Sequence, residues 1–511
     1  MLSFRKYPVI YEVNTRLWLS ALSAKYGTPM HLGAVTEEEL ALLRSRGFDA
    51  LWLMGIWEPS PVGQAIARAH EGLRREFIRA LPDLREKDIL SSPYAVNSYT
   101  VSSNLGGEEG LRDLRSKAHK AGLPVMLDFV PNHTALDHPW VTEHPEYYVG
   151  GSLEDYYRDT GTFFNAGNEY HPVVIAHGRD PYYPAWTDTA QLNYFNASTR
   201  EAMKATLLEI ASKCDGVRCD MAMLILNEIH MGIWGERLFP EGRRRRIPGE
   251  FWQEAIEEVK AVHPEFLFAA EAYWMKEGEL QFMGFDYTYD KALYDWLRSA
   301  EPLKIENYIG GGPFFYQERC LRFIENHDED RAAAVFSPEH LKTAALIAGT
   351  LPGARLYHEG QLEGYRRKLP VQLGRRERED RDEELWLFYE KLLSLTSQEV
   401  FHRGRWQYLP TYSAWEGNNT YQNFIVYLWA LRTELYLVVT NLSPQRSQCY
   451  VPLPPGGIEG KTCTLVDLLD DNLYERDGDL LSTKGLYLDM GPFYRHLFRI
   501  EVPAATQASP V

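Results

Sequence analysis

The sequence predicts an α/β protein built on a (β/α)₈ TIM barrel, with an excursion domain after the third strand and a C-terminal antiparallel β-sandwich. Three observations predict this fold class. Short apolar runs alternate with helical patterns through most of the chain, as expected for a parallel sheet covered by helices. Four of these runs end in a carboxylate, and functional side chains of such barrels gather at the C-terminal ends of the strands. The last part of the chain changes to short strand-like runs separated by turn residues.

Eight segments are assigned to the barrel strands. In chain order they are residues 9–19, 49–57, 125–133, 216–222, 266–274, 285–290, 323–328 and 354–360. Several are near-continuous apolar runs, which is typical of parallel strands buried on both faces. Helices are expected at residues 36–47, 108–122, 200–213 and 251–264. The first of these begins with a Thr-x-x-Glu capping pattern and ends at a glycine, and the last ends at a proline.

Two intervals are too long to be simple connections, and both follow predicted barrel strands. Residues 63–92 are charged and have helical periodicity, whereas residues 134–191 are rich in Tyr, Gly, Pro, Asp and His. Long insertions at the C-terminal end of barrel strands usually serve function. The predicted domains are the barrel at 1–133 and 192–398, the excursion domain at 134–191 and the sandwich at 399–503, followed by a disordered tail at 504–511.

The bulk composition argues against several classes of partner. The 511 residues carry a formal net charge of −17, which disfavours nucleic acids and anionic membranes as partners. The 5 cysteines form no C-x-x-C pair, so neither a disulfide framework nor a zinc site is expected. The N-terminal residues lack a signal-peptide pattern, and no segment approaches the ~20 apolar residues of a membrane span. These features predict a cytoplasmic protein that binds neither nucleic acid nor membrane.

Seven polar side chains lie at the ends of the predicted third, fourth, fifth and seventh strands. They are Asp128, His133, Arg218, Asp220, Glu271, His327 and Asp328. The strand ends of one barrel would bring these side chains to a common rim. Arg218 and Asp220 are two residues apart and so project from the same face of a strand, where the arginine would keep the carboxylate ionised. Four carboxylates with an arginine and two histidines indicate acid–base or covalent catalysis.

The four segments that carry these residues resemble, in their order, the motifs of the α-amylase superfamily, glycoside hydrolase family 13. The segments are VMLDFVPNH, GVRCDMA, FLFAAEAYW and FIENHD, and the resemblance extends over about residues 7–502. Any one motif is weak, but four in the right order on strands are specific. The resemblance implies a retaining hydrolase that acts on α-glucosidic bonds of oligosaccharides or an α-glucan by double displacement, through a glycosyl–Asp220 intermediate. It implies no organic cofactor.

The resemblance also implies a role for each matching residue. Asp220 matches the nucleophile, Glu271 the general acid/base, and Asp328 the third carboxylate, which grips ring hydroxyls of the substrate. The residues matched to the substrate-binding positions are Arg218, which orients the nucleophile, His133 and His327, which hydrogen-bond the same sugar, and Tyr94, which stacks beneath it. Apolar neighbours of Glu271 would raise its pKa, so that it holds a proton near neutral pH.

Two further positions concern the framework of the site. Asp128 is expected to tie the barrel mouth together by hydrogen bonds to Arg218 or its neighbours. Asn132 corresponds to an asparagine that ligates calcium in many relatives. Calcium needs several oxygen ligands, and Asn132 is the single one that can be named, so the sequence leaves calcium open.

The chain departs from the family's pattern at several positions. Met223 and Leu224 replace the Lys-His pair that serves the leaving-group side in typical α-amylases, and Ser98 replaces the usual aspartate before a tyrosine. Gly55 stands where a proline is common after the second strand. These changes disfavour a starch endo-amylase. They leave open an α-glucosyl or maltosyl transferase, trehalose-forming or phosphorolytic, and, with less support, a non-catalytic glucan-binding relative.

Hydrolysis and transglycosylation require the same catalytic residues, so the motifs do not separate them. The outcome depends on how the acceptor side admits water. Trp57, Tyr273 and Trp274 follow strand ends and are candidates to shape the acceptor side, with plain packing as the alternative.

Clusters of basic residues follow the fourth and eighth strands. They comprise Arg243 to Arg246, Arg366 to Lys368, Arg375, Arg376 and Arg378. Loops after the last barrel strands often bind phosphate, so a site for a phosphorylated sugar or a phosphate acceptor is one interpretation. The favoured interpretation is a set of solvated loops neutralised by nearby acids such as Glu377, Glu379 and Asp380.

Overall fold

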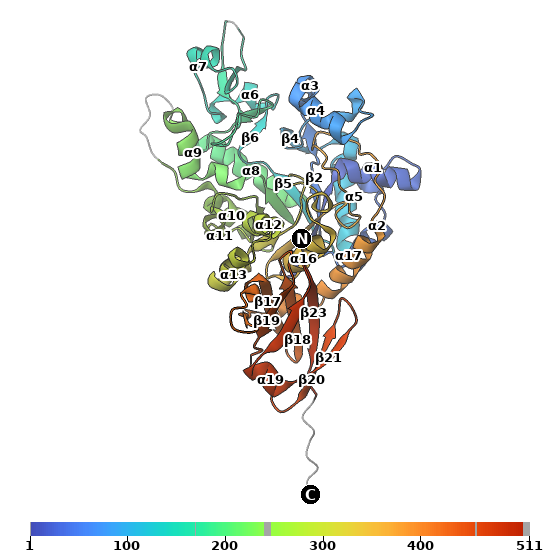
Figure 1. The fold of residues 1–511 in the computed structure, drawn as a ribbon. Coiled ribbons are helices and arrows are strands. Elements are labelled where there is room, and N and C mark those ends of the chain that lie inside the picture. Colours follow the sequence, from blue (N-terminus) through green and yellow to red (C-terminus); the bar gives the residue numbers. More distant parts are fainter. Residues whose placement is uncertain (1, 169, 240–246, 455–456, 504–511) are drawn as a thin grey trace.

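A closed barrel of eight parallel strands forms the main body of the computed structural model, which describes residues 2–168, 170–239, 247–454 and 457–503 (Figure 1). The barrel strands, in chain order, are β1 (Val9–Asn14), β2 (Ala50–Met54), β5 (Val125–Phe129), β10 (Gly216–Cys219), β11 (Leu267–Ala270), β12 (Tyr287–Tyr289), β13 (Cys320–Arg322) and β14 (Ala354–His358). Each strand pairs with the next, and β14 pairs with β1 to close the barrel. The predicted fold class is confirmed. The predicted disordered tail and Arg243 to Arg246 lie outside the described residues.

The first barrel strand is shorter than predicted. It ends at Asn14, and helix α1 (Thr15–Tyr26) begins at the next residue. The Asn14 side chain accepts a hydrogen bond from the backbone N–H of Leu17 at 3.3 Å and so caps the helix. Residues 15–19 therefore belong to a helix, and the apolar residues on both sides of Asn14 did not reveal the change.

The seventh barrel strand lies earlier than predicted, at β13. The segment 323–328, which carries the carboxylate motif, is a loop that follows this strand. In that loop the Asn326 side chain accepts hydrogen bonds from the backbone N–H groups of Asp328 and Glu329, both at 2.9 Å. Such side-chain-to-backbone bonds favour a turn over a strand, which explains the correction.

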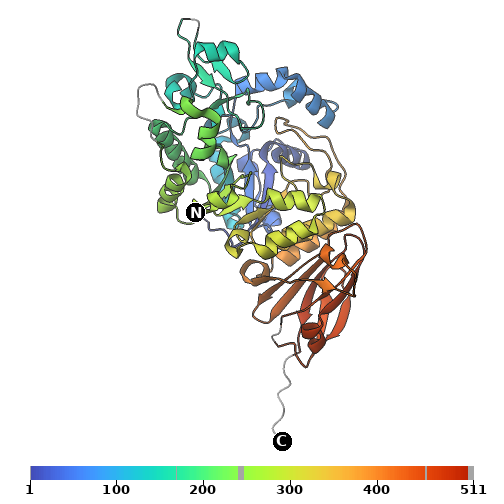
Figure 2. The ribbon, with the colours of Figure 1, turned by 60° about the vertical axis from the view of Figure 1, so that its left-hand side comes forward.

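Helices cover the outer face of the barrel (Figure 2). The four predicted helices are confirmed as α2 (Glu37–Ser45), α5 (Gly107–Lys120), α8 (Ala197–Lys213) and α10 (Phe251–Val262). Later helices are α12 (Lys291–Arg298), α16 (Pro338–Thr350) and α17 (Glu383–Thr396). At the start of α2 the Thr36 hydroxyl accepts a hydrogen bond from the backbone N–H of Glu39 at 3.3 Å, as the capping pattern predicts.

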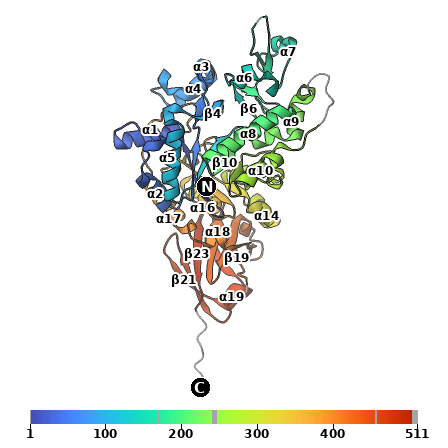
Figure 3. The same cartoon turned by 180° about the vertical axis from the view of Figure 1, so that it is seen from behind.

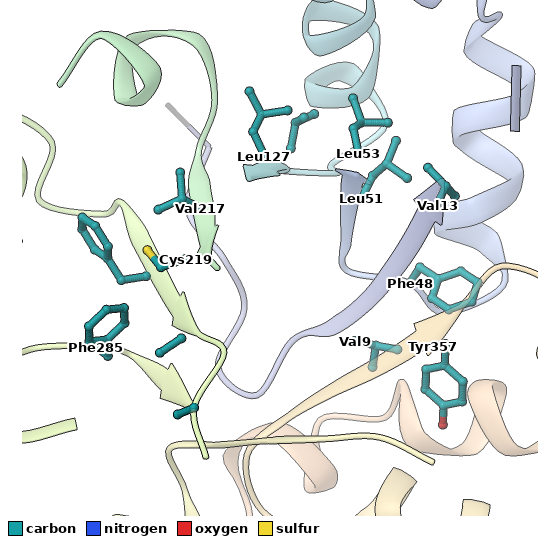
Figure 4. Packing of buried hydrophobic residues seen from close by; sticks show 14 of the residues in the cluster. Val9, Val13, Phe48, Leu51, Leu53, Leu127, Val217, Cys219, Phe285 and Tyr357 are labelled. Atoms are coloured by element: carbon teal, nitrogen blue, oxygen red, sulfur yellow. The ribbon is translucent and has the colours of Figure 1, made fainter. Parts of the chain in front are cut away.

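Successive residues of each barrel strand point to opposite faces of the sheet. Val13 and Leu53 are fully buried and pack in the apolar layer between the strands and the surrounding helices (Figure 4). Glu12 and Trp52 are the residues directly before them, and the strand register sets these two side by side. They therefore face the barrel interior, where the polar layer of the site is built.

Two excursions extend from the C-terminal ends of the barrel strands and lie at the same end of the barrel (Figures 1 and 3). The first contains α3 (Pro61–Ala69) and α4 (Glu71–Ala80), flanked by the paired strands β3 (Trp57–Pro59) and β4 (Val96–Val101). The second contains β6 (His133–Ala135), α6 (Trp140–Glu143), α7 (Leu153–Arg158), β7 (Phe163–Asn165), β8 (Val174–Ala176) and β9 (Thr189–Gln191). Because β6 pairs with β9, the second excursion closes on itself.

The C-terminal strands form two antiparallel sheets at the other end of the barrel (Figure 1). The larger sheet has the order β15 (Arg405–Tyr408), β17 (Phe424–Leu431), β18 (Glu434–Asn441), β23 (Arg495–Glu501), β20 (Thr462–Asp467) and β21 (Leu473–Asp477). The smaller sheet consists of β16 (Tyr412–Ser413), β19 (Ser447–Val451) and β22 (Leu486–Met490). The indole N–H of Trp429 donates to the backbone oxygen of Thr350 at the end of α16 (2.8 Å), which holds this domain against the barrel. Among the described helices, none combines the length and apolar character needed to cross a bilayer.

Candidate active site

Arg218 is the centre of the site. It lies on β10 beside Asp128 of β5 in the strand register, and its side chain is 1% exposed. Its Nη1 contacts Asp220 Oδ1 at 2.5 Å, and its Nη2 contacts Glu271 Oε2 at 2.7 Å and Asp328 Oδ2 at 3.9 Å. A buried guanidinium is stable when carboxylates compensate its charge. The three carboxylates expected to be catalytic are therefore gathered around one cation.

Glu271 is held in an environment that favours its protonated form. Burial is the largest cause that raises its pKa, and the negative charges of Asp220 and Asp328 add to it, so that the pKa reaches about 7 although Arg218 acts in the opposite direction. The hydroxyl of Tyr273 donates to Oε1 at 2.8 Å. A carboxyl group that titrates near neutral pH is suited to donate a proton to a leaving group.

The backbone after β10 also contacts this carboxyl group. The N–H of Met221 donates to Glu271 Oε2 at 2.6 Å. Met221 has a φ of 43°, a left-handed conformation that is uncommon for residues other than glycine. Strained backbone of this kind is concentrated at functional sites.

Asp328 and His327 form a charged pair at the mouth of the barrel. Their Oδ2 and Nε2 atoms are 3.0 Å apart, and the Asp328 side chain is 44% exposed. Burial alone would raise the pKa of Asp328, but the charges of His327 and Arg218 outweigh it and hold the pKa well below its ordinary value. Burial alone would lower the pKa of His327, but Asp328 and Glu12 raise it well above its ordinary value. Both shifts favour an imidazolium at His327 and an ionised carboxylate at Asp328.

Tyr94 and His133 complete the set of predicted residues at the mouth. The Tyr94 ring stacks on His327 with a centroid distance of 5.4 Å, and the two side chains share a hydrogen bond of 2.7 Å. His133 is buried at the start of β6, and burial lowers its pKa while the nearby charge of Asp220 opposes that shift. All seven site residues predicted from the sequence thus lie around one barrel end.

Sequence reasoning missed Glu12 and Trp52. Glu12 is fully buried and its carboxylate contacts Nδ1 of His327, which orients that imidazole. The Trp52 ring lies 5.6 Å from the Arg218 guanidinium. A glutamate in the middle of the apolar run at residues 9–13 was the signal that could have revealed the first of them, because a lone buried charge requires a partner.

Asp128 ties the barrel mouth to the end of β2. It accepts hydrogen bonds from the Trp52 indole N–H (3.2 Å) and the Gly55 backbone N–H (2.9 Å), and burial is the main cause that raises its pKa to about 6. Asp128 was expected to form hydrogen bonds with Arg218 or with the neighbours of Arg218. Its hydrogen bonds come from Trp52, whose ring lies close to the Arg218 guanidinium, and from Gly55. Gly55 has a φ of 76°, and a Cβ there would lie 2.8 Å from Cβ of Pro93. A proline, which is common at this position, has no backbone N–H to donate to Asp128 and cannot adopt this positive φ.

We expect Gly55→Ala to destabilise the protein by roughly 1–3 kcal/mol. Alanine is strained in the left-handed backbone conformation, and its methyl group would clash with Pro93. Gly107→Ala is the matched control, since Gly107 has a φ of 63° but no atom lies within 4 Å of the position that the alanine methyl group would take. Thermal unfolding of both variants checks the prediction. Equal losses of Tm would show that the contact with Pro93 contributes nothing.

Asn132, the one candidate calcium ligand, is bonded to Gln191 of β9. The Gln191 Nε2 group donates to the backbone oxygen of Asn132 (2.8 Å), to its Oδ1 (2.9 Å) and to the backbone oxygen of Leu192 (3.1 Å). Three oxygens thus accept hydrogen bonds from one amide nitrogen, which lies between them. These residues do not fit a calcium site. In the described part of the chain, one group of acidic and histidine side chains lies close enough to share a metal ion, namely Asp467, Asp470 and His496 in the sandwich.

The basic residues after β14 are largely paired with acids. Arg367 contacts Glu377, as expected, but Arg375 contacts Asp83 and Asp88 of the first excursion at 3.0 and 2.9 Å. These pairs support the interpretation of neutralised loops over a phosphate site.

The three aromatic candidates for the acceptor side differ in the structure. Trp57 is buried and its indole N–H donates to the backbone oxygen of Asp128 at 2.8 Å, so it packs in the framework. Tyr273 contacts Glu271 through its hydroxyl. Trp274, with a φ of 60°, places its ring 5.1 Å from that of Tyr182, an exposed residue of the second excursion. Trp274 and Tyr182 therefore offer an aromatic surface beside the acid.

Comparison with known proteins identifies the family of this chain. The family model of the alpha amylase catalytic domain matches residues 32–385, a span that includes all seven predicted site residues. The chain belongs to the alpha-amylase family. Among curated proteins of this family, the alpha-amylase MalA of Haloarcula japonica is 26% identical over 366 residues, covering 70% of this chain and 44% of that protein. An alpha-1,4-glucan:maltose-1-phosphate maltosyltransferase of Rhodospirillum rubrum is 24% identical over 339 residues, covering 62% of this chain and 40% of that protein.

The alpha-amylase family chain spans less than half the length of these curated relatives. Solved alpha-amylase structures cover nearly all of it. The noncanonic maltogenic alpha-amylase AmyB from Thermotoga neapolitana has a TM-score of 0.67 at 20% identity, covering 98% of this chain and 99% of its own. An alpha-amylase from Lactobacillus plantarum has a TM-score of 0.66 at 21% identity, covering 97% and 99%. This similarity shows that the barrel and the C-terminal domain of this chain have the same fold as the solved alpha-amylases.

Proposed function

We propose that this chain is a retaining glycoside hydrolase that acts on α-glucosidic bonds of oligosaccharides or an α-glucan. The observation that carries the proposal is the contact of one buried guanidinium, Arg218, with both Asp220 and Glu271. Two carboxyl groups held by one guanidinium favour the spacing of ~5–5.5 Å that is typical of retaining enzymes over the ~6.5–9.5 Å of inverting ones.

In the first step Asp220 attacks the anomeric carbon with a carboxylate oxygen. Glu271 gives its proton to the glycosidic oxygen as the bond between that oxygen and the anomeric carbon breaks. The step yields a glycosyl ester of Asp220, a free leaving sugar and an ionised Glu271. The raised pKa of Glu271 supports its role as the proton donor.

In the second step Glu271 removes a proton from water or from a sugar hydroxyl. The oxygen of that acceptor attacks the anomeric carbon, the ester bond to Asp220 breaks, and Glu271 regains its proton. Two displacements at one carbon restore the original configuration. Asp328, His327 and His133 would hold hydroxyl groups of the reacting sugar, and the Tyr94 ring would lie against its face.

A transferase is the second candidate, and the aromatic surface of Trp274 and Tyr182 favours it. Such a surface can hold an acceptor sugar in competition with water. The maltosyltransferase named among the relatives supports the same possibility. Met223 and Leu224, which replace the Lys-His pair, are fully buried and so belong to the core rather than to the acceptor side.

Product analysis tests the proposed function. Wild type and Asp220→Asn are incubated with maltose, maltotriose and glycogen, with and without inorganic phosphate, and the products are resolved by chromatography. Glucose or short maltodextrins from wild type alone would support the hydrolase. New disaccharides or sugar phosphates would support the transferase. If neither wild type nor Asp220→Asn forms a product from any donor, a non-catalytic glucan-binding protein would be favoured.

We expect Trp274→Ala to lower the ratio of transglycosylation to hydrolysis by roughly 2- to 10-fold, because one aromatic contact to the acceptor is worth ~0.5–1.5 kcal/mol. The ratio is measured from longer oligosaccharides and glucose released from maltotriose. Trp415→Ala is the control, since Trp415 is an exposed tryptophan of the sandwich. An unchanged ratio in Trp274→Ala would mean that the ring only packs against Tyr182.

We propose that the joint between β6 and β9 is held by the Gln191 amide in place of calcium. We expect the Tm of wild type to be the same in calcium and in a chelator. Gln191→Glu removes the donors and sets a carboxylate against carbonyl oxygens, which should cost roughly 1–3 kcal/mol in chelator. Calcium should restore this loss, because the new oxygen set suits that ion. Gln191→Leu, the control, should lose stability without recovery, and calcium-dependent stability of wild type would contradict the proposal.

The described thiols support one further proposal. Cys214, Cys219, Cys320, Cys449 and Cys463 are all buried and unpaired, which suits a reducing compartment such as the cytoplasm.

A further inference from the structure

A cleft of about 420 Å³ lies outside the set of catalytic residues. Its walls come from the first turn of α1, from β3 and from the segments that precede β4 and α5. The residues that matter here are Arg16, Glu58, Leu90, Ser91, Asn104 and Leu105. The volume falls within the ~300–1,000 Å³ that is typical of small-molecule sites.

Two side chains of opposite charge line this cleft without forming an ion pair. Arg16 donates one hydrogen bond, from Nη1 to the backbone oxygen of Ser91 at 3.2 Å. Burial lowers the pKa of Arg16 to about 10, against the opposing charge of Glu58. Within residues 2–168, 170–239, 247–454 and 457–503, no hydrogen bond or ion pair joins the Glu58 carboxylate to another group. Arg16 therefore keeps free donors and Glu58 keeps free acceptors.

Ser91 adds a polar group without a partner. Its side chain is 1% exposed, and its hydroxyl makes no hydrogen bond to the rest of the described chain. Buried polar groups in native structures are almost always hydrogen-bonded, so an orphaned hydroxyl in the wall of a cleft points to a ligand or a water. Asn104 is exposed at the same cleft and offers both a donor and an acceptor.

The lining selects an uncharged ligand rich in hydroxyl groups. The charges of Arg16 and Glu58 cancel, so neither an anion nor a cation is favoured. A hydroxyl group both donates and accepts, and neighbouring hydroxyls of a sugar can bond Arg16 and Glu58 at once. Leu90 and Leu105 supply apolar surface for the C–H faces of such a ring. We propose that this cleft is a second binding site for a short neutral sugar, of one or two hexose units.

The cleft shares two chain segments with the catalytic mouth. Ser91 lies three residues before Tyr94, and Arg16 lies four residues after Glu12, and both Tyr94 and Glu12 contact His327. The bound sugar is therefore either a separate molecule or the end of a longer glucan that also occupies the catalytic residues. The chemistry of the cleft is the same in both cases, and it does not depend on the proposed catalytic function.

Calorimetric titration of full-length Asp220→Asn with maltose tests the proposal. Arg16→Leu and Glu58→Gln, each added to this background, should weaken binding at one maltose site by roughly tenfold or more, as expected for a lost hydrogen bond to a charged group. Arg446→Leu is the control, because the Arg446 side chain is 67% exposed and lies in the sandwich, at the other end of the barrel. Thermal unfolding confirms that each variant is folded. Unchanged maltose binding in both cleft variants would overturn the proposal.

Maltoheptaose then separates the two sources of the sugar. Two molecules bound per chain would show an independent site, whereas one molecule whose affinity falls in Arg16→Leu would show a continuous glucan. Either result supports a sugar in the cleft. Loss of all turnover in the product analysis, with maltose binding that still depends on Arg16, would refute the catalytic proposal and leave this one intact.

Discussion

Asp220→Asn is expected to lower kcat by about 10⁴-fold or more, because removal of a catalytic nucleophile eliminates the covalent route. The change is nearly isosteric, and it keeps a hydrogen-bond acceptor for Arg218 Nη1 at the position that Asp220 Oδ1 holds at 2.5 Å. Loss of activity would therefore reflect lost nucleophilicity rather than a collapsed site. Initial rates on maltotriose, with Tm measured alongside, check this expectation.

A control variant and a chemical rescue test the assignment of Asp220 as the nucleophile. Asp137→Asn removes a carboxylate that accepts hydrogen bonds from Ser60 and Val62, outside the set of candidate catalytic residues, so the activity of this variant should stay near that of wild type. In Asp220→Gly, added azide should attack the anomeric carbon from the vacated side and release a glycosyl azide of inverted configuration. A kcat of Asp220→Asn within tenfold of wild type would exclude Asp220 as the nucleophile.

Glu271→Gln is expected to lower kcat on natural sugars by about 10²- to 10⁴-fold, the usual contribution of a general acid. A substrate with a good leaving group, such as an α-glucosyl fluoride, needs no proton in the first step. Its glycosylation rate should therefore fall much less than that of maltose. Stopped-flow measurement of the first turnover on both substrates checks this difference, and equal losses on both would contradict the role of proton donor.

The pH profile provides an independent test of the same residue. The pKa of Glu271 is raised to about 7, chiefly by burial, and the acid must be protonated to act. The kcat/KM of wild type on maltose should therefore fall as the pH rises through about 7. Glutamine does not titrate, so this basic limb should vanish in Glu271→Gln. A basic limb that persists in the variant would assign the ionisation to another group.

Much of the fold could be predicted because the local patterns agree with the tertiary structure. The apolar runs ending in Asp128, Asp220 and Glu271 are buried barrel strands or their immediate ends, and the Thr36 capping pattern begins a real helix. The two errors arose where a side chain rather than hydrophobicity decides the backbone. Asn14 caps a helix in the middle of the segment predicted as the first strand, and Asn326 makes a turn where a strand was expected.

The barrel, the order of its motifs and the seven candidate site residues could be predicted from the amino-acid sequence alone. These follow from hydrophobic periodicity and from short motifs, which are local along the chain. The sequence also showed that Gly55 departs from the usual proline, without giving the reason.

The interactions between these groups depend on the three-dimensional arrangement of the chain. The raised pKa of Glu271 depends on burial and on two carboxylates distant in the sequence. The pKa of His327 is raised by Asp328 and by Glu12, which is 315 residues away. The hydrogen bond of the Gln191 amide to Asn132, and the cleft lined by Arg16 and Glu58, likewise join segments that no local pattern connects. Electrostatic energies depend on distance and burial in space, which a one-dimensional pattern does not contain.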